Sequence, residues 1–450
     1  MKNAFHKLTV AIKPEVWERI GWTLLVCLLL GGLPVALYRA LSDNTNDFTC
    51  FHQAGRYVLE HGARDPESGL SKYLPSADVA WMALGWMPLG LAAIVWYLIG
   101  VGSWFGLLRA IGRYLLADLE PVLRRRTVLV AGLLAALLAI DGFCLGSFHV
   151  FMVWFMVAGL GRIAQNRNWS GGGLLGLAIW IKLLPLLGVA LLLWKRKWLP
   201  AAVALACMLL VDVTLSVGGL GPKAAWNEHV NWLAQEGCGS TSRQLNCVGC
   251  VDEDRPRNQS TVAVLRRLLT KYGNQINPVR HSVILAKLSP RELTGVYLAV
   301  VGLLGLAVAV FCRRAGRATS GPQWSAEIAL VALTTLWVSP VVWSYHSTAA
   351  APALAVVLGK SQRSRWLAWL VIVVWMLGVC LLGSPLARAC GSQLWINLLL
   401  GLALLWVSRQ LRQQEIDRQQ TPSRVFSCAV MAPRPSNLRK EPSCPQTVLQ

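Results

Sequence analysis

The chain has 450 residues, of which 55% are hydrophobic and only 14% are charged, and its mean hydropathy is +0.48. About a quarter of a soluble domain is charged, so this composition excludes an ordinary soluble enzyme and predicts a chain that lies mostly in lipid. The formal net charge of +21 comes from basic residues clustered between apolar runs. This pattern indicates orientation by the positive-inside rule, and the absence of a basic face interleaved with aromatic residues argues against a nucleic-acid partner.

Ten apolar runs alternate with short polar segments, which predicts an all-α multi-span membrane protein with about ten spans. The basic residues 1–19 are expected in the cytosol, and the run at 20–41 has no cleavage site and should deliver residues 42–80 to the outside. The later runs lie near 82–108, 128–140, 150–161, 198–217, 293–312, 324–343, 347–359, 366–383 and 394–407. This order places both termini inside and a second outer loop at 218–290. The run at 347–359 is short, so its helix should extend into the flanks.

The apolar segment 171–194 interrupts this alternation of sides. Basic residues flank it at both ends, from Arg167 before it to Lys195 after it, so a single crossing would leave one cluster outside. Lys182 and Pro185 lie at its middle, where proline removes a backbone donor. We therefore expect a re-entrant helical hairpin that enters and leaves on the cytosolic side. Irregular backbone at membrane depth must be shielded by protein or a wet cavity.

The C-terminal residues 409–450 are rich in Gln, Pro, Ser and Arg, a composition typical of disorder. The predicted organisation is therefore a cytosolic N-terminus at 1–19, a transmembrane domain at 20–408 and a disordered cytosolic tail at 409–450. No internal repeat supports a transporter built from two halves.

The unusual polar residues share the outer side in this topology, with Lys182 reaching toward it from the hairpin tip. Ionisable groups within or beside lipid are costly and indicate function. We therefore predict one outward-facing polar site. The residues concerned are Asp43, Asp47, His52, Tyr73, Asp141, His149, Lys182, Asn258, Gln259, Arg266 and His346.

Each of these residues also has a structural alternative. Asp47 stands where it could cap an interfacial helix that begins at "FTCFHQAGRYVLEHG". Lys182 could extend its amine to the membrane surface. His52 is typical of a helix face, His149 of a residue packed among aromatic side chains, and Asp141 of a turn cap. The sequence leaves these alternatives open.

Three cysteines lie close together in the long outer loop. Cys238, Cys247 and Cys250 end in a C-x2-C spacing that zinc sites also use, but no histidine accompanies them at ligand spacing. Disulfides are the favoured interpretation for a segment outside the cell, with Cys50 or Cys390 as further partners. The pairing is not determined by the sequence.

Several separate segments occur in one order: "NDFTCFHQAGRYVLEHG", "KYLP", the hairpin, "NQSTVAVLRRLL" and "SPVVWSYHSTAAAPAL". Through them, about residues 20–410 resemble the polyprenol-phosphate-mannose-dependent mannosyltransferases of glycosyltransferase family 87, in the GT-C superfamily of multi-span enzymes. The resemblance implies that 20–408 is a GT-C-type catalytic domain in the plasma or inner membrane. Such an enzyme of the cell envelope moves a hexose, here expected to be mannose, from a polyprenyl-phosphate donor to a glycolipid or glycan acceptor on the outer face.

The resemblance also implies roles for single residues. Enzymes of this kind carry a catalytic carboxylate just after the first span, where Asp47 stands, and it acts as the general base for an inverting attack by the acceptor hydroxyl. Cations should hold the leaving phosphate. The outer loops contain no Asp-x-Asp motif, so neither a metal nor another cofactor is expected beside the lipid-linked donor. The expected phosphate and substrate ligands are Tyr73, Lys182, Asn258, Gln259, Arg266 and His346.

Two features depart from the family pattern. Gly146-Ser147 stands where relatives carry Gly-Gln, and the Cys-rich insert at 235–257 is unusual, which leaves the sugar and the acceptor open. The main alternative function is a multi-span transporter or lipid flippase, in which Lys182 and His346 would bind substrate or protons. That alternative predicts acids buried in mid-span, and the sequence offers mainly Asp212 and Glu327. A non-catalytic membrane scaffold is the second alternative.

Overall fold

A computed structural model describes residues 14–42, 46–65, 73–234, 256–270, 283–313, 321–361 and 364–420. The chain divides into two units, Met1–Ser408 and Arg409–Gln450. Every regular element in the described ranges is helical, as the all-α prediction requires. The elements are α2 (Pro14–Gly31), α3 (Leu33–Ser42), α4 (Asp47–His61), α5 (Ser76–Ala80), α6 (Met82–Gly85), α7 (Leu89–Ala110), the π-helix η1 (Ile111–Leu115), α8 (Pro121–Leu145), α9 (His149–Ala164), α10 (Asn168–Ile181), α11 (Leu186–Trp194), α12 (Trp198–Leu220), α13 (Pro222–Trp232), α15 (Thr261–Leu269), α16 (Pro290–Arg313), α17 (Pro322–Val338), the 3-10 helix η4 (Ser344–Ala350), α18 (Ala351–Lys360), α19 (Arg365–Leu381), α20 (Pro385–Ala389) and α21 (Ser392–Gln420).

Six helical segments of the described chain are long and apolar enough to cross a membrane. Helices α9 and α19 are apolar but shorter, so the count of about ten spans stays a prediction. The short run at 347 does extend into its flank, because η4 precedes α18 directly. The six candidate spans are Glu15–Ser42, Leu89–Leu115, Pro121–Leu145, Trp198–Leu220, Pro290–Cys312 and Ser392–Gln413.

The first candidate span is broken between α2 and α3. The break precedes Pro34, which has no backbone N–H to donate. Neighbouring helices add contacts to the backbone around it: the Tyr97 hydroxyl donates to the Leu29 carbonyl, and the Cys144 thiol donates to the Gly32 carbonyl at 3.4 Å. Both carbonyls also accept a backbone N–H, from Gly32 and Ala36 respectively. The break thereby anchors the segment that leads to Asp47 on α7 and α8.

The segment 171–194 forms two helices, α10 and α11, with a break at Lys182, whose backbone is extended (φ −158°, ψ 136°). A Cβ on Gly172 would lie 2.8 Å from the Cβ of Val203, and a Cβ on Gly176 would lie 2.7 Å from that of Cys207. These contacts ascend α10 and α12 together, so the two helices run in the same direction. The chain between them must double back, which is the connectivity of a hairpin. Its placement in a membrane stays a prediction.

Helix α17 is enclosed by the rest of the protein, and each residue from Gln323 to Trp337 is buried. Its Glu327 accepts from the Lys195 amine at 2.9 Å, and both side chains are at most 1% exposed. This pair fixes the end of α11 to α17. Glu327 is thus one half of a structural ion pair, whereas a transporter would need it as a mid-span carrier.

We expect Lys195→Met to destabilise the protein by about 3–5 kcal/mol, because it leaves the Glu327 carboxylate buried without its counter-charge. The double variant Lys195→Met/Glu327→Leu should recover much of that loss, since both charges are then removed. Thermal unfolding in detergent measures both changes. A double variant as unstable as the single one would show that packing around Lys195, and not the charge pair, determines the effect.

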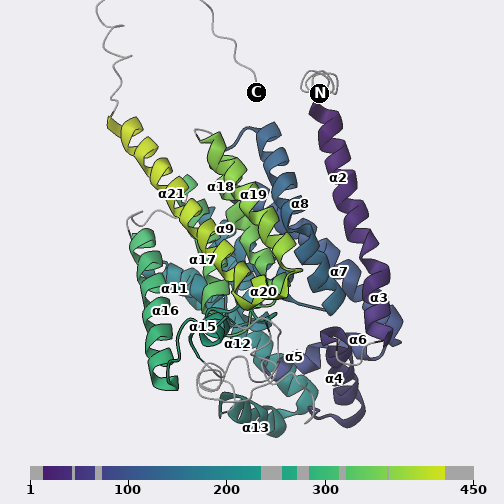
Figure 1. The fold of residues 1–450 in the computed structure, drawn as a ribbon. Helices are drawn as coiled ribbons and strands as arrows, with labels where there is room; N and C mark the ends of the chain where they lie inside the picture. The colour runs from purple at the N-terminus through teal and green to yellow at the C-terminus, as the bar shows by residue number, and fades with distance from the viewer. Residues whose placement is uncertain are drawn as a thin grey trace, which may run out of the picture. The chain divides into compact units, whose positions relative to one another are not determined.

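Short helices gather where α3 and the long helix α12 end. Figure 1 shows α4, α5 and α6 grouped beside α3. Asp212 of α12 accepts from the Ser76 hydroxyl of α5 and pairs with His229 of α13 at 2.7 Å. Arg64 joins Asp78 at 2.7 Å. Asp212, the second acid that a transporter would require, therefore serves to hold α5 and α13 on α12.

The C-terminal segment and the outer-loop cysteines were also the subject of predictions. Helix α21 continues to Gln420, past residue 409 where the tail was expected to begin, because its Arg, Gln, Leu and Glu residues favour helix and Pro422 follows. Residues 421–450 lie outside the described ranges. So do Asp43, Cys238, Cys247 and Cys250, and disulfide formation in the outer loop stays a prediction.

Candidate active site

Asp47 is the first residue of α4, but it does not cap the helix. The cap is Asn46, whose side-chain oxygen accepts from the Phe48 N–H at 3.2 Å while its amide nitrogen donates to the Cys144 carbonyl at 3.3 Å. Asp47 is therefore not the cap residue, although it is an acid in the first turn, where the helix dipole favours one. Asn46 also ties the start of α4 to the end of α8 through this bond to Cys144. The Asp47 side chain itself is exposed.

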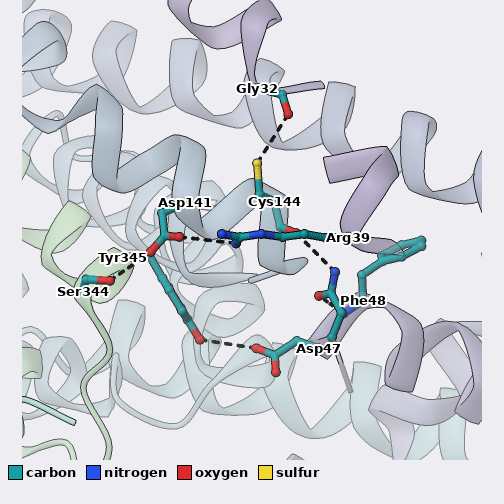
Figure 2. Close-up of polar contacts among 9 residues, drawn as sticks. Gly32, Arg39, Asp47, Phe48, Asp141, Cys144, Ser344 and Tyr345 are labelled. Atoms are coloured by element: carbon teal, nitrogen blue, oxygen red, sulfur yellow. Dashed lines mark hydrogen bonds and ion pairs between the residues drawn. The ribbon is translucent and has the colours of Figure 1, made fainter. Parts of the chain in front are cut away.

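Two tyrosines approach the Asp47 carboxylate. The Tyr345 hydroxyl donates to Asp47 Oδ2 at 3.3 Å across 298 residues of sequence (Figure 2). Burial and then the negative charge of Asp47 raise the pKa of Tyr345 well above its usual value. The same two causes raise the pKa of Tyr73. Both phenols therefore stay neutral and can donate hydrogen bonds to anionic groups at physiological pH.

Polar contacts from α3 and α8 hold η4, which carries Tyr345, in place. The Ser344 hydroxyl donates to Asp141 Oδ2 at 2.9 Å, and Arg39 lies 3.5 Å from Asp141 Oδ1 (Figure 2). A Cβ on Gly142 would lie only 3.2 Å from the Cβ of Tyr345, so α8 and η4 are in close contact. Asp141 lies within α8 and does not cap a turn. It positions η4.

His346 follows Tyr345 and is buried beside another histidine. Its Nδ1 accepts from the Trp343 N–H at 3.0 Å, so the neutral ring carries its proton on Nε2. The ring centroids of His346 and His149 are 4.6 Å apart. Burial, then the positive charge of Lys182, then His149 lower the pKa of His346 well below its usual range. Lys182, predicted from the hairpin tip, is thus close enough to act on His346.

Aromatic rings form a wall beside this group. Phe51 stacks on Trp81 with centroids 4.8 Å apart, and the Phe148 ring lies 5.1 Å from Phe51 and 5.8 Å from Tyr73. His52 lies behind the wall and bonds the Met87 carbonyl at 2.9 Å, which is the helix-face role that the sequence left open. Tyr73 and Phe148 are half-buried, so their rings border the space near Asp47.

Gly146 and Ser147 each have a structural role at the junction of α8 and α9. Gly146 ends α8 with φ +83°, and a Cβ there would lie 2.5 Å from the Cβ of Phe48. Only glycine fits this left-handed turn against α4. The Ser147 hydroxyl accepts from the His149 N–H at 3.2 Å at the start of α9. Serine therefore supplies an acceptor for the first turn of α9.

Asn258 and Gln259, both predicted as substrate ligands, bond mainly to the backbone. Asn258 Oδ1 accepts from the Val342 N–H at 2.9 Å, and Gln259 Nε2 donates to the Arg388 carbonyl at 2.8 Å. Both are almost completely buried. These contacts hold the segment 256–260 against the loop that leads into η4. Their direct contact with substrate stays a prediction.

Arg266 lies on α15 and is 4% exposed. Its neighbour Arg267 has a clear structural role, since Nη1 donates to the Asn258 carbonyl at 2.7 Å and Nε donates to the Ala389 carbonyl at 3.3 Å. The sequence thus assigned the functional role to Arg266 and not to the neighbour that makes these backbone contacts. Arg266 as a phosphate ligand stays a prediction.

Sequence comparison adds an independent finding. The profile of glycosyltransferase family 87 matches residues 73–340, more than half of the chain. The chain belongs to glycosyltransferase family 87. It is 29% identical over 431 residues to a polyprenol-phosphate-mannose-dependent alpha-(1-2)-phosphatidylinositol mannoside mannosyltransferase from Mycolicibacterium smegmatis. The alignment covers 90% of this chain and 87% of the relative. No solved structure matches the chain.

The resemblance expected from the sequence is thereby confirmed, and this family 87 protein is a membrane glycosyltransferase. The matched range includes Tyr73, Lys182 and Arg266, whereas Asp47 and His346 lie outside it. The family 87 match assigns no role to any of these residues. The structure brings Asp47, Tyr345 and His346 to one place, and this geometry makes them candidates for the active site. Tyr345 was not predicted, and its only sequence signal was its position beside His346 in "WSYH".

The depressed pKa of His346 predicts a loss of stability in acid. Below about pH 6.5 the unfolded chain binds a proton at His346 that the folded protein resists, so the free energy of unfolding falls as the pH decreases. We expect the Tm to decrease from pH 7 to pH 5, and to decrease less in His346→Gln, which keeps an acceptor for the Trp343 N–H. Equal pH dependence of the two proteins would contradict this assignment.

Proposed function

We propose that this family 87 enzyme transfers mannose from polyprenyl-phosphate mannose to a glycolipid acceptor, with inversion, at an outward-facing site centred on Asp47. The name of the relative from Mycolicibacterium smegmatis supports the donor and the class of acceptor. The observation that carries the proposal is the convergence of an exposed carboxylate, a neutral tyrosine and a buried histidine under the influence of a lysine. An inverting transfer needs a base on one side of the sugar and cations on the other.

Asp47 acts as the general base. Its exposed carboxylate takes the proton from the acceptor hydroxyl as that oxygen bonds to the anomeric carbon. The Tyr345 hydroxyl donates to Oδ2 and fixes the orientation of the carboxylate. A base of ordinary strength suffices, since the hydroxyl loses its proton only as the new bond forms.

Lys182 and His346 hold the departing lipid phosphate. The leaving group is already stable as an anion, so no protein acid has to protonate it. The Lys182 amine supplies the opposing charge, and the Nε2–H of neutral His346 supplies a further donor. His149 lines the same place, and Arg266 is the proposed additional cation. We propose no metal or other cofactor, because the phosphate charge is met by side chains.

The aromatic wall binds the sugar. Half-buried Tyr73 and Phe148 present ring faces and edges beside Asp47, and such rings suit the apolar face of a hexose. Asn258 and Gln259 support the loop before η4 and so position Tyr345 and His346 for the donor. A change at either residue should therefore disturb the site through η4.

The proposed membrane topology places this site on the outer side. The basic ends of the spans face the cytosol, about ten spans cross the plasma or inner membrane, and α10 and α11 form a re-entrant hairpin. The hairpin carries Lys182 toward the outer side, where the prenyl chain enters from the bilayer. A lipid-linked donor suits such a site, since nucleotide sugars stay in the cytosol.

The test is sugar transfer by the purified protein in liposomes. The reaction contains radiolabelled polyprenyl-phosphate mannose and a phosphatidylinositol mannoside acceptor, and GDP-mannose replaces the donor in a control reaction. We expect label in the lipid product only with the polyprenyl donor, with release by an exo-α-mannosidase and no effect of EDTA. Transfer from GDP-mannose, or a β-linked product, would contradict the proposal.

A further inference from the structure

An open cavity of about 470 Å³ lies between α2, α7 and α8, near the end of α8 opposite to Asp141. Four arginines line it: Arg109, Arg113, Arg124 and Arg125. Arg124 and Asp141 are 17 residues apart on one helix, which corresponds to about 25 Å along its axis. The cavity is therefore separate from the proposed active site.

The four arginines reach the cavity from two elements of different geometry. Arg109 belongs to the last turn of α7, and Arg113 lies four residues on, in the π-helix η1, so both point to one face. A single π-turn within a helix often marks a functional site. Arg124 and Arg125 lie in the first turns of α8. The walls are apolar and include Trp22 and Phe105.

The cavity carries a clear excess of positive charge. In the described ranges, Arg109 and Arg124 make no ion pair, and Arg125 pairs with Glu18 at 2.8 Å with the Arg125 side chain 56% exposed. Cations near the start of α8 are also opposed by the helix dipole. Orientation by the positive-inside rule requires these charges only on one side of the membrane. It does not require four of them around one cavity with apolar walls, and this arrangement indicates an anionic ligand.

We propose that this cavity binds the phosphate headgroup of an anionic phospholipid from the cytosolic leaflet. The guanidinium group matches phosphate oxygens with paired hydrogen bonds, and basic cavities between membrane helices are suited to such headgroups. The acyl chains lie along Trp22 and Phe105. The ligand keeps the ends of α2, α7 and α8 together, which is a role independent of the transfer reaction.

The experiment is native mass spectrometry of the full-length protein after delipidation and addition of defined lipids. The probes are phosphatidylglycerol, phosphatidylcholine, polyprenyl phosphate and inorganic phosphate. The variant is Arg109→Gln/Arg124→Gln, which breaks no ion pair in the described ranges. Arg126→Gln/Arg167→Gln is the matched control, because both residues are expected on the same side but neither lines the cavity. A second variant, Arg109→Lys/Arg124→Lys, retains the positive charges but lacks the planar guanidinium groups that form paired hydrogen bonds with phosphate.

We expect the wild type to retain phosphatidylglycerol in preference to phosphatidylcholine. Retention should fall about tenfold in the glutamine variant, less in the lysine variant, and remain unchanged in the control. Equal retention by the wild type and the glutamine variant would overturn the proposal. So would a loss of polyprenyl phosphate in the glutamine variant that exceeds its loss of phosphatidylglycerol, or complete competition by inorganic phosphate at equal concentration. A glutamine variant that is monodisperse and still active in sugar transfer shows that any loss of lipid is not a loss of fold.

Discussion

Replacing Asp47 with asparagine is expected to lower the rate of sugar transfer by about 10²–10⁴-fold while the protein stays folded. The amide keeps the size of the side chain and can still accept from the Tyr345 hydroxyl, but it cannot take a proton from the acceptor. The cap of α4 should persist, since Asn46 provides it. Transfer of radiolabelled mannose in liposomes measures the loss, and donor retention shows whether binding is preserved.

Glu60→Gln is the matched control, because it removes a carboxylate from the other end of the same helix, α4. Glu60 pairs with Arg56 on the surface, where such pairs contribute little. We expect this variant to transfer sugar like the wild type. Full activity of Asp47→Asn would exclude Asp47 as the base. The search would then move to His346, since Asp141 is engaged with Arg39 and Ser344, and His52 with the Met87 carbonyl.

Replacing Lys182 with glutamine is expected to cost about 10²–10³-fold in kcat/KM for the lipid-linked donor, the usual effect of removing one group that stabilises transition-state charge. Lys182 ends α10 at the point where the hairpin turns, and its charge already depresses the pKa of His346. Its loss should therefore also raise the pKa of His346. Measurement of kcat/KM as a function of pH tests both effects, because protonation of His346 should then begin at higher pH.

Lys182→Arg should retain more activity than Lys182→Gln, because it keeps the positive charge. Lys197→Gln, beyond the far end of α11, is the control for a lost charge on the same hairpin. Unchanged kcat/KM in Lys182→Gln would remove Lys182 from the phosphate site. A change in KM for the acceptor alone would assign the lysine to acceptor binding and also contradict the proposed role.

Much of the helical framework could be predicted from local patterns. Apolar runs of span length became helices, and the break at Lys182 and Pro185 was predicted because proline removes a donor from any helix. The resemblance to family 87 could also be recognised from short segments in order. The number of spans could not, because the apolar run at 324–343 reads as a span, whereas α17 is buried in protein from Gln323 to Trp337.

The sequence by itself thus determined that the chain is helical, membrane-bound and related to a family of glycosyltransferases, since hydropathy, proline and short motifs act over a few neighbouring residues. Only the tertiary structure decided which polar groups meet. It assigned the cap of α4 to Asn46, set Tyr345 against Asp47, and used Asp141 to hold Ser344 over 203 residues of sequence. Such contacts depend on how the helices pack, because packing sets the position of each face in space. No local pattern around Asp47 or Tyr345 contains that information.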